Sequence, residues 1–405
     1  MRINRPGNDK GEGRSNLKVA ICTTNFPRWQ GDFRVPFILE AARAISHHGN
    51  EVKVLTMHTP GASTHEYFDE IEVFRAKYLP EKLEVLQKDA SGIPEAWRRG
   101  FLPKLATIPF LLRFILLIAK QAKGSDIIHC NWSLSGLAAY LSKFVHKTPY
   151  IITVQGSDVF KTINIPVVRN VIGLALRKAS HIIALSNELK NATIRFGVPA
   201  ERITVIPNGV NISQFPVGPK DGRKNQLLFV GSLIERKGVS YLIEAMSVLK
   251  ASYPDLQLII VGEGKDRNVL EALTKQLDLD GNITFIGTQS QEHVSELMRE
   301  SRLFILPSIE EGQGVVLVEA LASGTPCIGS RVGGIPDVIM PEVGKVVDAR
   351  DVQGLSEAIE SFLFDDDLWK ATSKNARIRA ETNYDWNSIA KKMIKIYQSV
   401  ISMEA

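Results

Sequence analysis

The chain has 405 residues, 44% of them hydrophobic and 23% charged, so it is long enough for two or three packed domains of ordinary globular composition. Three widely separated cysteines without metal-ligand spacing argue against a disulfide framework and a zinc site. Residues 1–210 carry 28 Lys and Arg against 17 Asp and Glu (+11), whereas residues 211–405 carry 21 against 27 (−6). The basic first half indicates an anionic partner, such as a phospholipid headgroup or a phosphorylated acceptor.

Residues 1–16 are polar and rich in glycine and contain no apolar segment. They predict a disordered leader and not a signal peptide, so we expect a cytoplasmic protein. The sequence has no helix-turn-helix, zinc-finger or RNP-type signature. Nucleic acid is therefore not an expected partner.

Short apolar segments rich in β-branched residues alternate with helical periodicity along most of the chain. The first series of predicted strands comprises 18–24, 51–57, 126–130, 150–156, 181–186 and 203–209. The second series comprises 226–232, 256–262, 283–287, 303–308, 325–330 and 344–349. Buried strands separated by crossover helices are typical of parallel sheets, so the sequence predicts an α/β protein with two Rossmann-like, doubly wound domains.

The boundary between the two predicted domains, 17–210 and 226–385, lies at residues 211–225. There Pro, Gly, Asn and charged residues replace the periodicity over about the length of a linker. Ligands of open α/β sheets bind beyond the carboxyl ends of the strands, and two such domains facing each other enclose a cleft. We expect the chemistry in this cleft.

Residues 97–123 combine a dense apolar run with six basic residues, and their longest uncharged stretch is shorter than the ~20 apolar residues needed to span a bilayer. The segment could lie in the interface of an anionic membrane, as a peripheral element of the first domain. A core helix that ends before the strand at 126–130 is the alternative that the sequence leaves open.

Polar or glycine-containing turns follow three strands of the second half, and each turn opens a helix. The turns carry Arg236 and Lys237, then Glu263, Gly264 and Lys265, and then the sequence IEEGQG with Glu311. Helix N-termini offer unpaired N–H groups and a partial positive charge, so these turns suit a diphosphate, to which Lys237 would add a full charge. The alternatives are a solvated lysine and, for VGEGKDR, an ordinary tight turn, because the third glycine of a dinucleotide fingerprint is missing.

Glu319 interrupts the apolar sequence VVLVEALA. An ionised carboxylate on such a helix is costly unless it is paired, and the vicinal hydroxyls of a ribose offer two donors to it. With a helix start near Gly314, Glu319 lies about 7.5 Å along the axis and Glu311 lies in the preceding loop. The two carboxylates would then face different parts of one ligand. A buried ion pair with an Arg or Lys is the alternative for Glu319.

The segments LLFVGSLIERKGVSYLIEAM, LIIVGEGKDRNVLEAL, ITFIG and LPSIEEGQGVVLVEALASGTPCIGSRVGGIPDVI resemble the C-terminal half of the family 4 (group 1) glycosyltransferases. These are retaining enzymes with the GT-B fold. The resemblance covers most of residues 17–400. It implies transfer of a sugar from a nucleotide-diphosphate sugar to a hydroxyl acceptor, in cell-surface polysaccharide or glycolipid biosynthesis.

The stretch from Glu311 to Glu319 is similar to the E-x7-E motif of that family. By resemblance, Glu319 would hold the ribose hydroxyls, Glu311 would face the transferred sugar, and Lys237 would hold the diphosphate. The other residues that the resemblance places at the donor are Gly231, Arg236, Gly262, Ile286, Gln313, Gly314 and Val315. It implies no cofactor and no metal.

The first half resembles the acceptor domain of the family more loosely, in NFPRWQGDF, IHCNW, TVQGSDV and the segment 184–210. The resemblance implies Gly31, Gln155 and Asp158 on the side of a sugar or lipid-linked acceptor. Residues 386–405 resemble the C-terminal helix that packs back on the first domain.

Three positions depart from the family pattern. Ser232 stands where the family has an arginine, Gln155 where it has a histidine, and Gln313 where it has a phenylalanine. Arg236 would have to replace the missing arginine. The exchange at Gln313 changes little if only its backbone matters.

No obvious nucleophile occupies the matched positions, although the sequence leaves a nucleophilic role of Glu311 open. We therefore favour a same-face route, in which the leaving phosphate accepts the proton of the acceptor. The Asp-x-Asp pairs Asp278/Asp280 and Asp365/Asp367 are interpreted as turn residues and not as metal ligands. The alternative functions are those of a GT-B-like sugar-nucleotide 2-epimerase and of a non-catalytic sugar-nucleotide-binding subunit.

Overall fold

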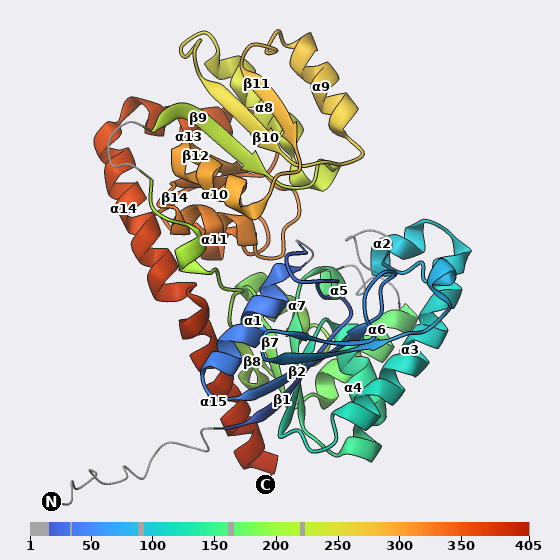
Figure 1. The fold of residues 1–405 in the computed structure, drawn as a ribbon. Helices are drawn as coiled ribbons and strands as arrows, with labels where there is room; N and C mark the ends of the chain where they lie inside the picture. Colours follow the sequence, from blue (N-terminus) through green and yellow to red (C-terminus); the bar gives the residue numbers. More distant parts are fainter. Residues whose placement is uncertain (1–15, 33–34, 88–92, 161–165, 219–222, 405) are drawn as a thin grey trace, which may run out of the picture.

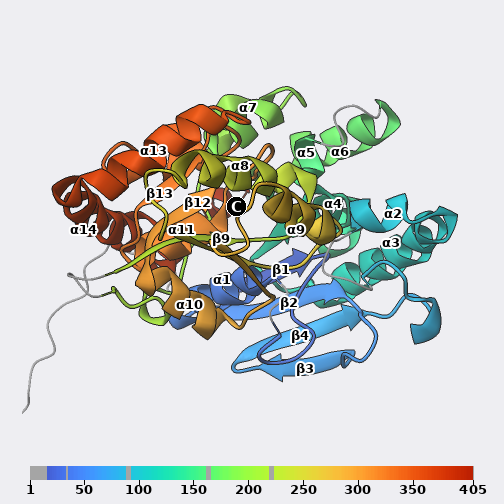
Figure 2. The same cartoon turned by 90° about the horizontal axis from the view of Figure 1, so that it is seen from above.

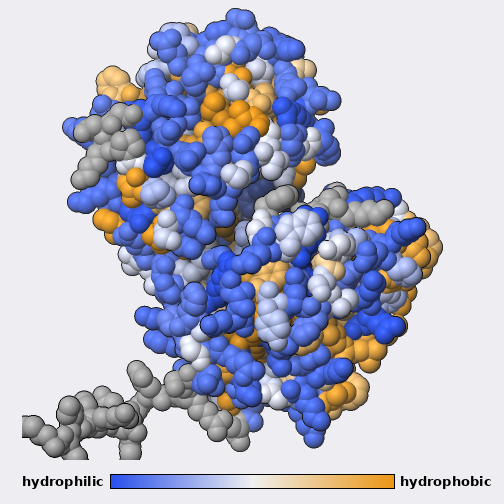
Figure 3. Space-filling model, in the orientation of Figure 1, coloured by the Kyte–Doolittle hydropathy of each residue, from blue (hydrophilic) through white to orange (hydrophobic). Residues whose placement is uncertain are grey.

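The computed structural model describes residues 16–32, 35–87, 93–160, 166–218 and 223–404. Except for Asn16, the predicted leader lies outside the described residues, as do residues 219–222 of the predicted linker. The described chain forms two lobes, each built on one sheet (Figure 1). Figure 3 shows the surface notched between them on the right of the view.

The first lobe contains an eight-stranded sheet with the order β3-β4-β2-β1-β5-β6-β7-β8. All of its strand pairs are parallel except β3 with β4. The strands are β1 (Lys18–Thr23), β2 (Glu51–Met57), β3 (His65–Phe68), β4 (Ile71–Ala76), β5 (Ile127–Asn131), β6 (Tyr150–Val154), β7 (His181–Ala184) and β8 (Ile203–Val205).

The sequence did not predict the hairpin of β3 and β4. Its strand β3 is an edge strand of four residues with alternating exposure, so it has no apolar run to detect. Asp69, in the two-residue turn, takes a positive φ of 55°. Figure 2, a view from above, shows these strands projecting beyond the second lobe.

The second lobe contains a six-stranded, fully parallel sheet with the order β11-β10-β9-β12-β13-β14. The strands are β9 (Lys224–Val230), β10 (Gln257–Val261), β11 (Ile283–Gly287), β12 (Ser301–Leu306), β13 (Cys327–Ser330) and β14 (Gly344–Val347). The chain builds outward in one direction from β9 and then in the other from β12. The order therefore reverses between these two strands, which is where doubly wound sheets bind ligands.

Helices cover both faces of each sheet, as predicted for two doubly wound domains. In the first lobe they are α1 (Pro36–His47), α2 (Ile93–Arg98), α3 (Phe101–Gln121), α4 (Ser133–His146), α5 (Ser157–Phe160), α6 (Pro166–Lys178) and α7 (Asn187–Ile194). The later helices are α8 (Val239–Leu249), α9 (Arg267–Gln276), α10 (Gln291–Glu300), α11 (Val315–Ala322), α12 (Ile335–Val338), α13 (Val352–Phe364), α14 (Asp366–Asn383) and α15 (Trp386–Glu404).

The two faces of the first sheet have separate cores. Helices α3, α4, α6 and α7 bury their apolar sides on one face, whereas α1 and α15 share the other. On the second face the Tyr397 hydroxyl lies 2.7 Å from Nδ1 of His129, inside the sheet. Helix α15 is thus held against the first lobe although it follows α14, which packs in the second.

The chain crosses between the lobes twice, and the two crossings lie side by side. The amide of Val210 donates to the carbonyl of Tyr384 at 2.7 Å, and Val210 also pairs with Asp385. A side chain at Gly209 would lie 2.7 Å from the Trp386 ring. The two segments are therefore in direct contact at the point where the lobes join.

Candidate active site

The turns that follow β9 and β10 lie backbone against backbone. A Cβ atom on Gly262, which has a φ of 132°, would lie 1.9 Å from the carbonyl oxygen of Gly231. A Cβ on Gly264 would lie 2.1 Å from the carbonyl oxygen of Leu233. The amide of Leu233 donates to the carbonyl of Glu263 at 2.9 Å. The glycines at these strand ends are thus required by close backbone approach, whatever else binds there.

The turn after β9 is also joined to the loop after β12, across the point where the sheet order reverses. The amide of Ile309 donates to the carbonyl of Arg236 at 2.7 Å. Gly238 takes a φ of 64°, and a Cβ there would lie 2.0 Å from the carbonyl oxygen of Pro307. This packing brings Lys237 beside Glu311, where Nζ and Oε2 are 2.5 Å apart.

The Lys237–Glu311 pair is largely enclosed, with side chains 14% and 11% exposed. Burial by itself would raise the pKa of Glu311, but the Lys237 ammonium, the Gly312 amide and the Arg236 charge together lower it below its usual value. Oε1 of Glu311 accepts from that amide at 3.0 Å. Glu311 is therefore ionised at neutral pH, and Lys237 is not the freely solvated lysine of the alternative interpretation.

Glu319 lies in α11, whose N-cap residue Gly314 has a φ of 80°. The residue is partly exposed, yet burial among the surrounding groups raises the pKa of its carboxyl to about 7. Among the described residues, no side chain forms an ion pair or hydrogen bond with this carboxylate. The structure therefore offers no support for the buried ion pair that the sequence left open.

The side chain of Gln313 reaches the segment that leads out of the first lobe. Its Oε1 accepts from the amide of Asn208 at 2.7 Å, and its Nε2 donates to the carbonyl of the same residue at 3.0 Å. Both residues are buried. The sequence left open whether only the backbone matters at this position, and the structure shows that the side chain also fixes the loop to the first crossing of the chain.

The neighbouring glycines extend this contact between the lobes. A Cβ on Gly312 would lie 2.8 Å from the carbonyl of Gln155, at the end of β6. The amide of Gly334 donates to the carbonyl of Gly312 at 3.0 Å, and Asp337 accepts from the Asn187 amide at 2.7 Å. The loop from Glu311 to Gly314 is thus enclosed by both lobes.

The other predicted donor residues lie around the same sheet edge. Val315 is the first residue of α11, and Ile286 lies near the end of β11, where its carbonyl accepts from the Gln289 side chain at 2.6 Å. Ser232 and Arg236 are exposed. Of these, Arg236 is close enough to Glu311 to affect its pKa, so a second cation acts at the site from the turn after β9.

The predicted acceptor-side residues follow strands of the first lobe. Gly31, with a φ of 87°, lies in the turn after β1, and Gln155 follows β6 and donates to Oδ1 of Asn131 at 3.1 Å. Asp158 belongs to the short helix α5, but its side chain lies outside the described part of the structure.

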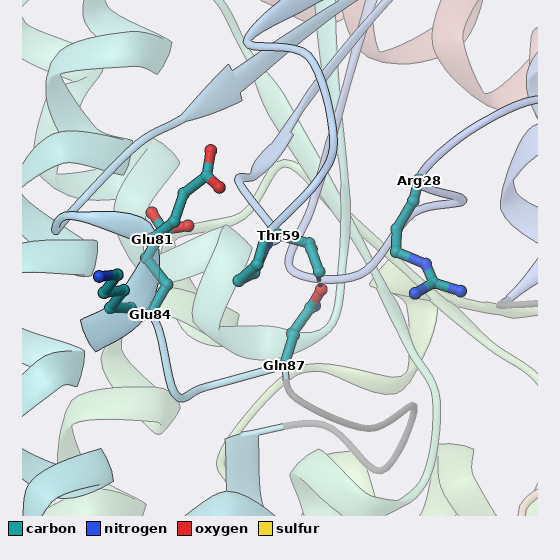
Figure 4. A pocket seen from close by; sticks show the side chains of 7 residues that line it. Arg28, Thr59, Glu81, Glu84 and Gln87 are labelled. Carbon is teal, nitrogen blue, oxygen red and sulfur yellow. Dashed lines mark hydrogen bonds between the residues drawn. The ribbon is translucent and has the colours of Figure 1, made fainter.

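A pocket of about 470 Å³ opens at the same sheet edge (Figure 4). Its lining residues are Arg28, Thr59, Pro60, Glu81, Lys82, Glu84 and Gln87. The Thr59 hydroxyl donates to Oε1 of Gln87 at 2.8 Å, and Arg28 pairs with Asp32 at 2.8 Å. The lining contains basic side chains, Arg28 and Lys82, and the acidic side chain of Glu81. Arg28 belongs to the segment NFPRWQGDF, whereas the other lining residues come from two further loops that carry no motif.

One member of each Asp-x-Asp pair has a structural role. Asp365 is the N-cap of α14 and accepts from the Leu368 amide at 2.8 Å. Asp278 has a positive φ of 54° and pairs with Lys250 at 2.8 Å on the surface. Within the described ranges, no group of three or more His, Cys, Asp and Glu side chains has the arrangement of a metal site.

Both halves of the chain match known protein families. The family described as "Glycosyltransferase Family 4" matches residues 36–214, and the family described as "Glycosyl transferases group 1" matches residues 211–379. The chain belongs to the family 4, group 1 glycosyltransferases. The resemblance inferred from the sequence motifs is thereby confirmed.

Curated relatives of this glycosyltransferase include enzymes with different acceptors. The N-acetyl-alpha-D-glucosaminyl L-malate synthase of Bacillus anthracis is 26% identical over 295 residues, which is 69% of this chain and 76% of that protein. The gpi3 subunit of the phosphatidylinositol N-acetylglucosaminyltransferase of Schizosaccharomyces pombe is 24% identical over 344 residues, covering 84% of this chain and 73% of that protein.

Solved glycosyltransferase structures share the fold. Sucrose-phosphate synthase from Thermosynechococcus elongatus has a TM-score of 0.78 and 22% identity, over 96% of this chain and all of that chain. HepE from Anabaena in complex with UDP has a TM-score of 0.72 and 18% identity, over 95% of this chain and all of that chain. The predicted GT-B fold is confirmed.

Proposed function

We propose that this glycosyltransferase is a retaining, metal-independent enzyme that moves a sugar from a nucleotide-diphosphate sugar to a hydroxyl acceptor. The observation that carries the proposal is the Glu319 carboxylate, which has no partner among the described residues and lies on the helix that begins at the Glu311 loop. A carboxylate placed this way suits the two hydroxyls of a ribose. HepE, a neighbour in fold, has been solved with UDP-glucose.

The donor diphosphate would lie at the turn after β9 and the start of α11. Lys237 and Arg236 supply positive charge there, and the first N–H groups of α11 point out of the helix. Lys237 pairs with Glu311 in the structure. The diphosphate would therefore compete with Glu311 for Lys237, and Glu311 would then be available to hydroxyls of the transferred sugar.

The reaction would follow the same-face route. As the bond between the anomeric carbon and the diphosphate oxygen breaks, the acceptor oxygen bonds to that carbon from the same side, and its proton passes to the leaving phosphate. The task of the protein is to position both substrates and to stabilise the charge on the leaving group, through Lys237, Arg236 and the start of α11.

Metal independence is supported by the positive charge that the protein itself supplies at the proposed diphosphate position. Two cationic side chains and a helix N-terminus surround the proposed diphosphate position. One carboxylate of each Asp-x-Asp pair is already engaged, since Asp365 caps a helix and Asp278 pairs with a lysine. Activity that disappears with EDTA and returns with magnesium would contradict this part of the proposal.

The acceptor would bind on the first-lobe side, near Gly31, Gln155, Asp158 and the pocket lined by Arg28 and Gln87. The basic and acidic side chains of that pocket suit a sugar or the polar head of a lipid-linked acceptor. One relative belongs, by its name, to a phosphatidylinositol N-acetylglucosaminyltransferase. We place the enzyme in the cytoplasm, peripheral to an anionic membrane, in polysaccharide or glycolipid synthesis.

A panel of nucleotide-sugars tests the proposal. We expect one donor of the panel to release nucleoside diphosphate. We also expect the product linkage, axial or equatorial, to have the same anomeric configuration as the donor by NMR. An epimerised sugar nucleotide without release would identify a 2-epimerase. Binding without turnover, at any acceptor tested, would identify a non-catalytic subunit, for which the absent arginine at Ser232 is the motivating observation.

A further inference from the structure

The helix α3 has two apolar sides, one in the core and one in solvent. Phe110, Phe114 and Ile118 are fully buried against the first sheet. The other side is exposed at Phe101 (72%), Leu102 (53%), Leu105 (47%), Ile108 (61%), Leu112 (58%) and Leu116 (62%). Only 28% of the most apolar window of α3 is buried. The role of a core helix, the alternative left open by the sequence, accounts for only one of these sides.

The neighbouring helix α4 extends the exposed apolar side. Its residues Leu141, Phe144 and Val145 are 41%, 80% and 45% exposed. Both helices bury their opposite sides in the same core, so their outer sides point away from the same face of the sheet. We call these nine residues of α3 and α4 the α3/α4 face. Figure 3 shows apolar residues along the lower right of the lower lobe, where Figure 1 draws the two helices.

Basic residues border this face. At about 100° per residue, Lys104 lies on one side of the exposed stripe of α3, and Arg113 and Lys120 lie on the other. All three are exposed, and within the described residues none has an ion-pair partner. Residues 97–123 and 133–146 contain no Asp or Glu. A second protein surface of acidic and apolar character would also fit, but an apolar stripe bordered by basic residues alone favours an anionic lipid surface.

We propose that the α3/α4 face docks this glycosyltransferase on an anionic lipid bilayer, with α3 lying in the plane of the interface. Apolar side chains would enter the headgroup region while Lys104, Arg113 and Lys120 meet the lipid phosphates. By length and composition α3 could cross a membrane. Its buried side packs on the sheet, however, so crossing would require the first core to open.

The orientation links the membrane to the acceptor, a step that rests on the proposed function. Helix α3 follows the segment Glu81–Gln87, which lines the pocket of the first lobe, and begins at the same edge of the sheet. Docking along α3 would therefore bring this pocket toward the bilayer. A lipid-linked acceptor could then reach the pocket while its chain stays in the membrane.

Flotation of the full chain with lipid vesicles tests the docking surface. We expect binding to vesicles of equal parts phosphatidylcholine and phosphatidylglycerol, weak binding to phosphatidylcholine alone, and loss of binding as NaCl increases. Arg113→Glu/Lys120→Glu should weaken binding by about tenfold or more. The matched control is Lys391→Glu/Lys392→Glu, two exposed lysines on α15 with the same change of net charge.

A second pair of variants tests the apolar contribution. Leu112→Gln/Leu116→Gln should weaken binding to the mixed vesicles, whereas Val248→Gln/Val269→Gln, exposed on α8 and α9, should not. All four replaced side chains are exposed, and equal melting temperatures would show intact folds.

Three results would overturn the inference. The first is that the wild type does not bind the mixed vesicles, and the second is that the face variants bind as well as their controls. The third is that the protein self-associates without lipid and that Leu112→Gln/Leu116→Gln abolishes this association, which would assign the face to a second copy. Nucleoside diphosphate release with a soluble acceptor tests the proposed function separately, because it requires no vesicle.

Discussion

Lys237 and Glu311, 74 positions apart in the sequence, form an ion pair of 2.5 Å where the order of the second sheet reverses. The pair joins the residue expected to hold the donor diphosphate to the residue expected to face the sugar. A donor whose diphosphate binds Lys237 would have to compete with Glu311 for it. Separate changes of the two residues should have opposite effects on nucleotide binding.

Replacing Lys237 by Met should lower kcat about 10²- to 10³-fold, because one preorganised charge on the leaving diphosphate is lost. Lys237→Arg retains the charge and should recover part of the rate. Steady-state kinetics of both variants with the best donor of the panel would measure this. A Lys237→Met enzyme with wild-type kcat would remove Lys237 from the mechanism.

Replacing Glu311 by Gln should tighten binding of the nucleoside diphosphate by about three- to tenfold, or about 1 kcal/mol, because the phosphates no longer compete with a carboxylate for Lys237. At the same time kcat should fall if Glu311 orients the sugar. Calorimetric titration gives the affinity. Weaker binding in this variant would show that Glu311 holds the nucleotide part directly.

The affinity for the donor should depend on the ionisation of Glu319. Its pKa is raised to about 7 by burial, so the carboxyl is mostly protonated at pH 6 and mostly ionised at pH 8. Ribose hydroxyls donate to the ionised form, so the affinity for the donor should rise about tenfold from pH 6 to pH 8. The same gain in affinity should be lost when the pH is lowered from 8 to 6.

Glu319→Gln is the control for this pH dependence. Terminal phosphates of free nucleotides lose a proton at about pH 6, which also changes the affinity with pH. This change is the same for the wild type and the variant, so the difference between their two pH profiles reports the ionisation of Glu319. The variant should bind more weakly at pH 8 and have the shallower pH profile. Parallel profiles of the two proteins would show that Glu319 does not bind the donor.

Replacing Gln313 by Ala should destabilise the protein by about 2 to 4 kcal/mol, because it leaves a buried N–H and a buried C=O of Asn208 without partners. The loop would also be held less firmly, so kcat should fall more than KM rises. Gln276→Ala, at an exposed position of α9, is the control in thermal unfolding and kinetics. A stable but slow Gln313→Ala enzyme would assign the residue to positioning alone.

The sequence predicted the strands of the second sheet closely, because buried parallel strands are continuous apolar runs bounded by glycine turns. Strand β12, predicted at 303–308, is found at Ser301–Leu306, and β11 has the predicted bounds. It missed β3, a four-residue edge strand with little apolar signal, and also β4, whose sequence IEVFRA alternates and buries four of its six residues. Propensity cannot detect a strand such as β3, which depends mainly on its neighbour.

The sequence by itself determined the fold class, the family and the two carboxylates of the motif, because these depend on local periodicity and on residues close together in the chain. Only the tertiary structure decided that Glu311 is paired with Lys237, that Glu319 has no partner among the described residues, and that Gln313 holds Asn208. Such contacts join segments about 70 to 105 residues apart. Their geometry follows from how turns of different strands meet at one edge of a sheet, which no local pattern records.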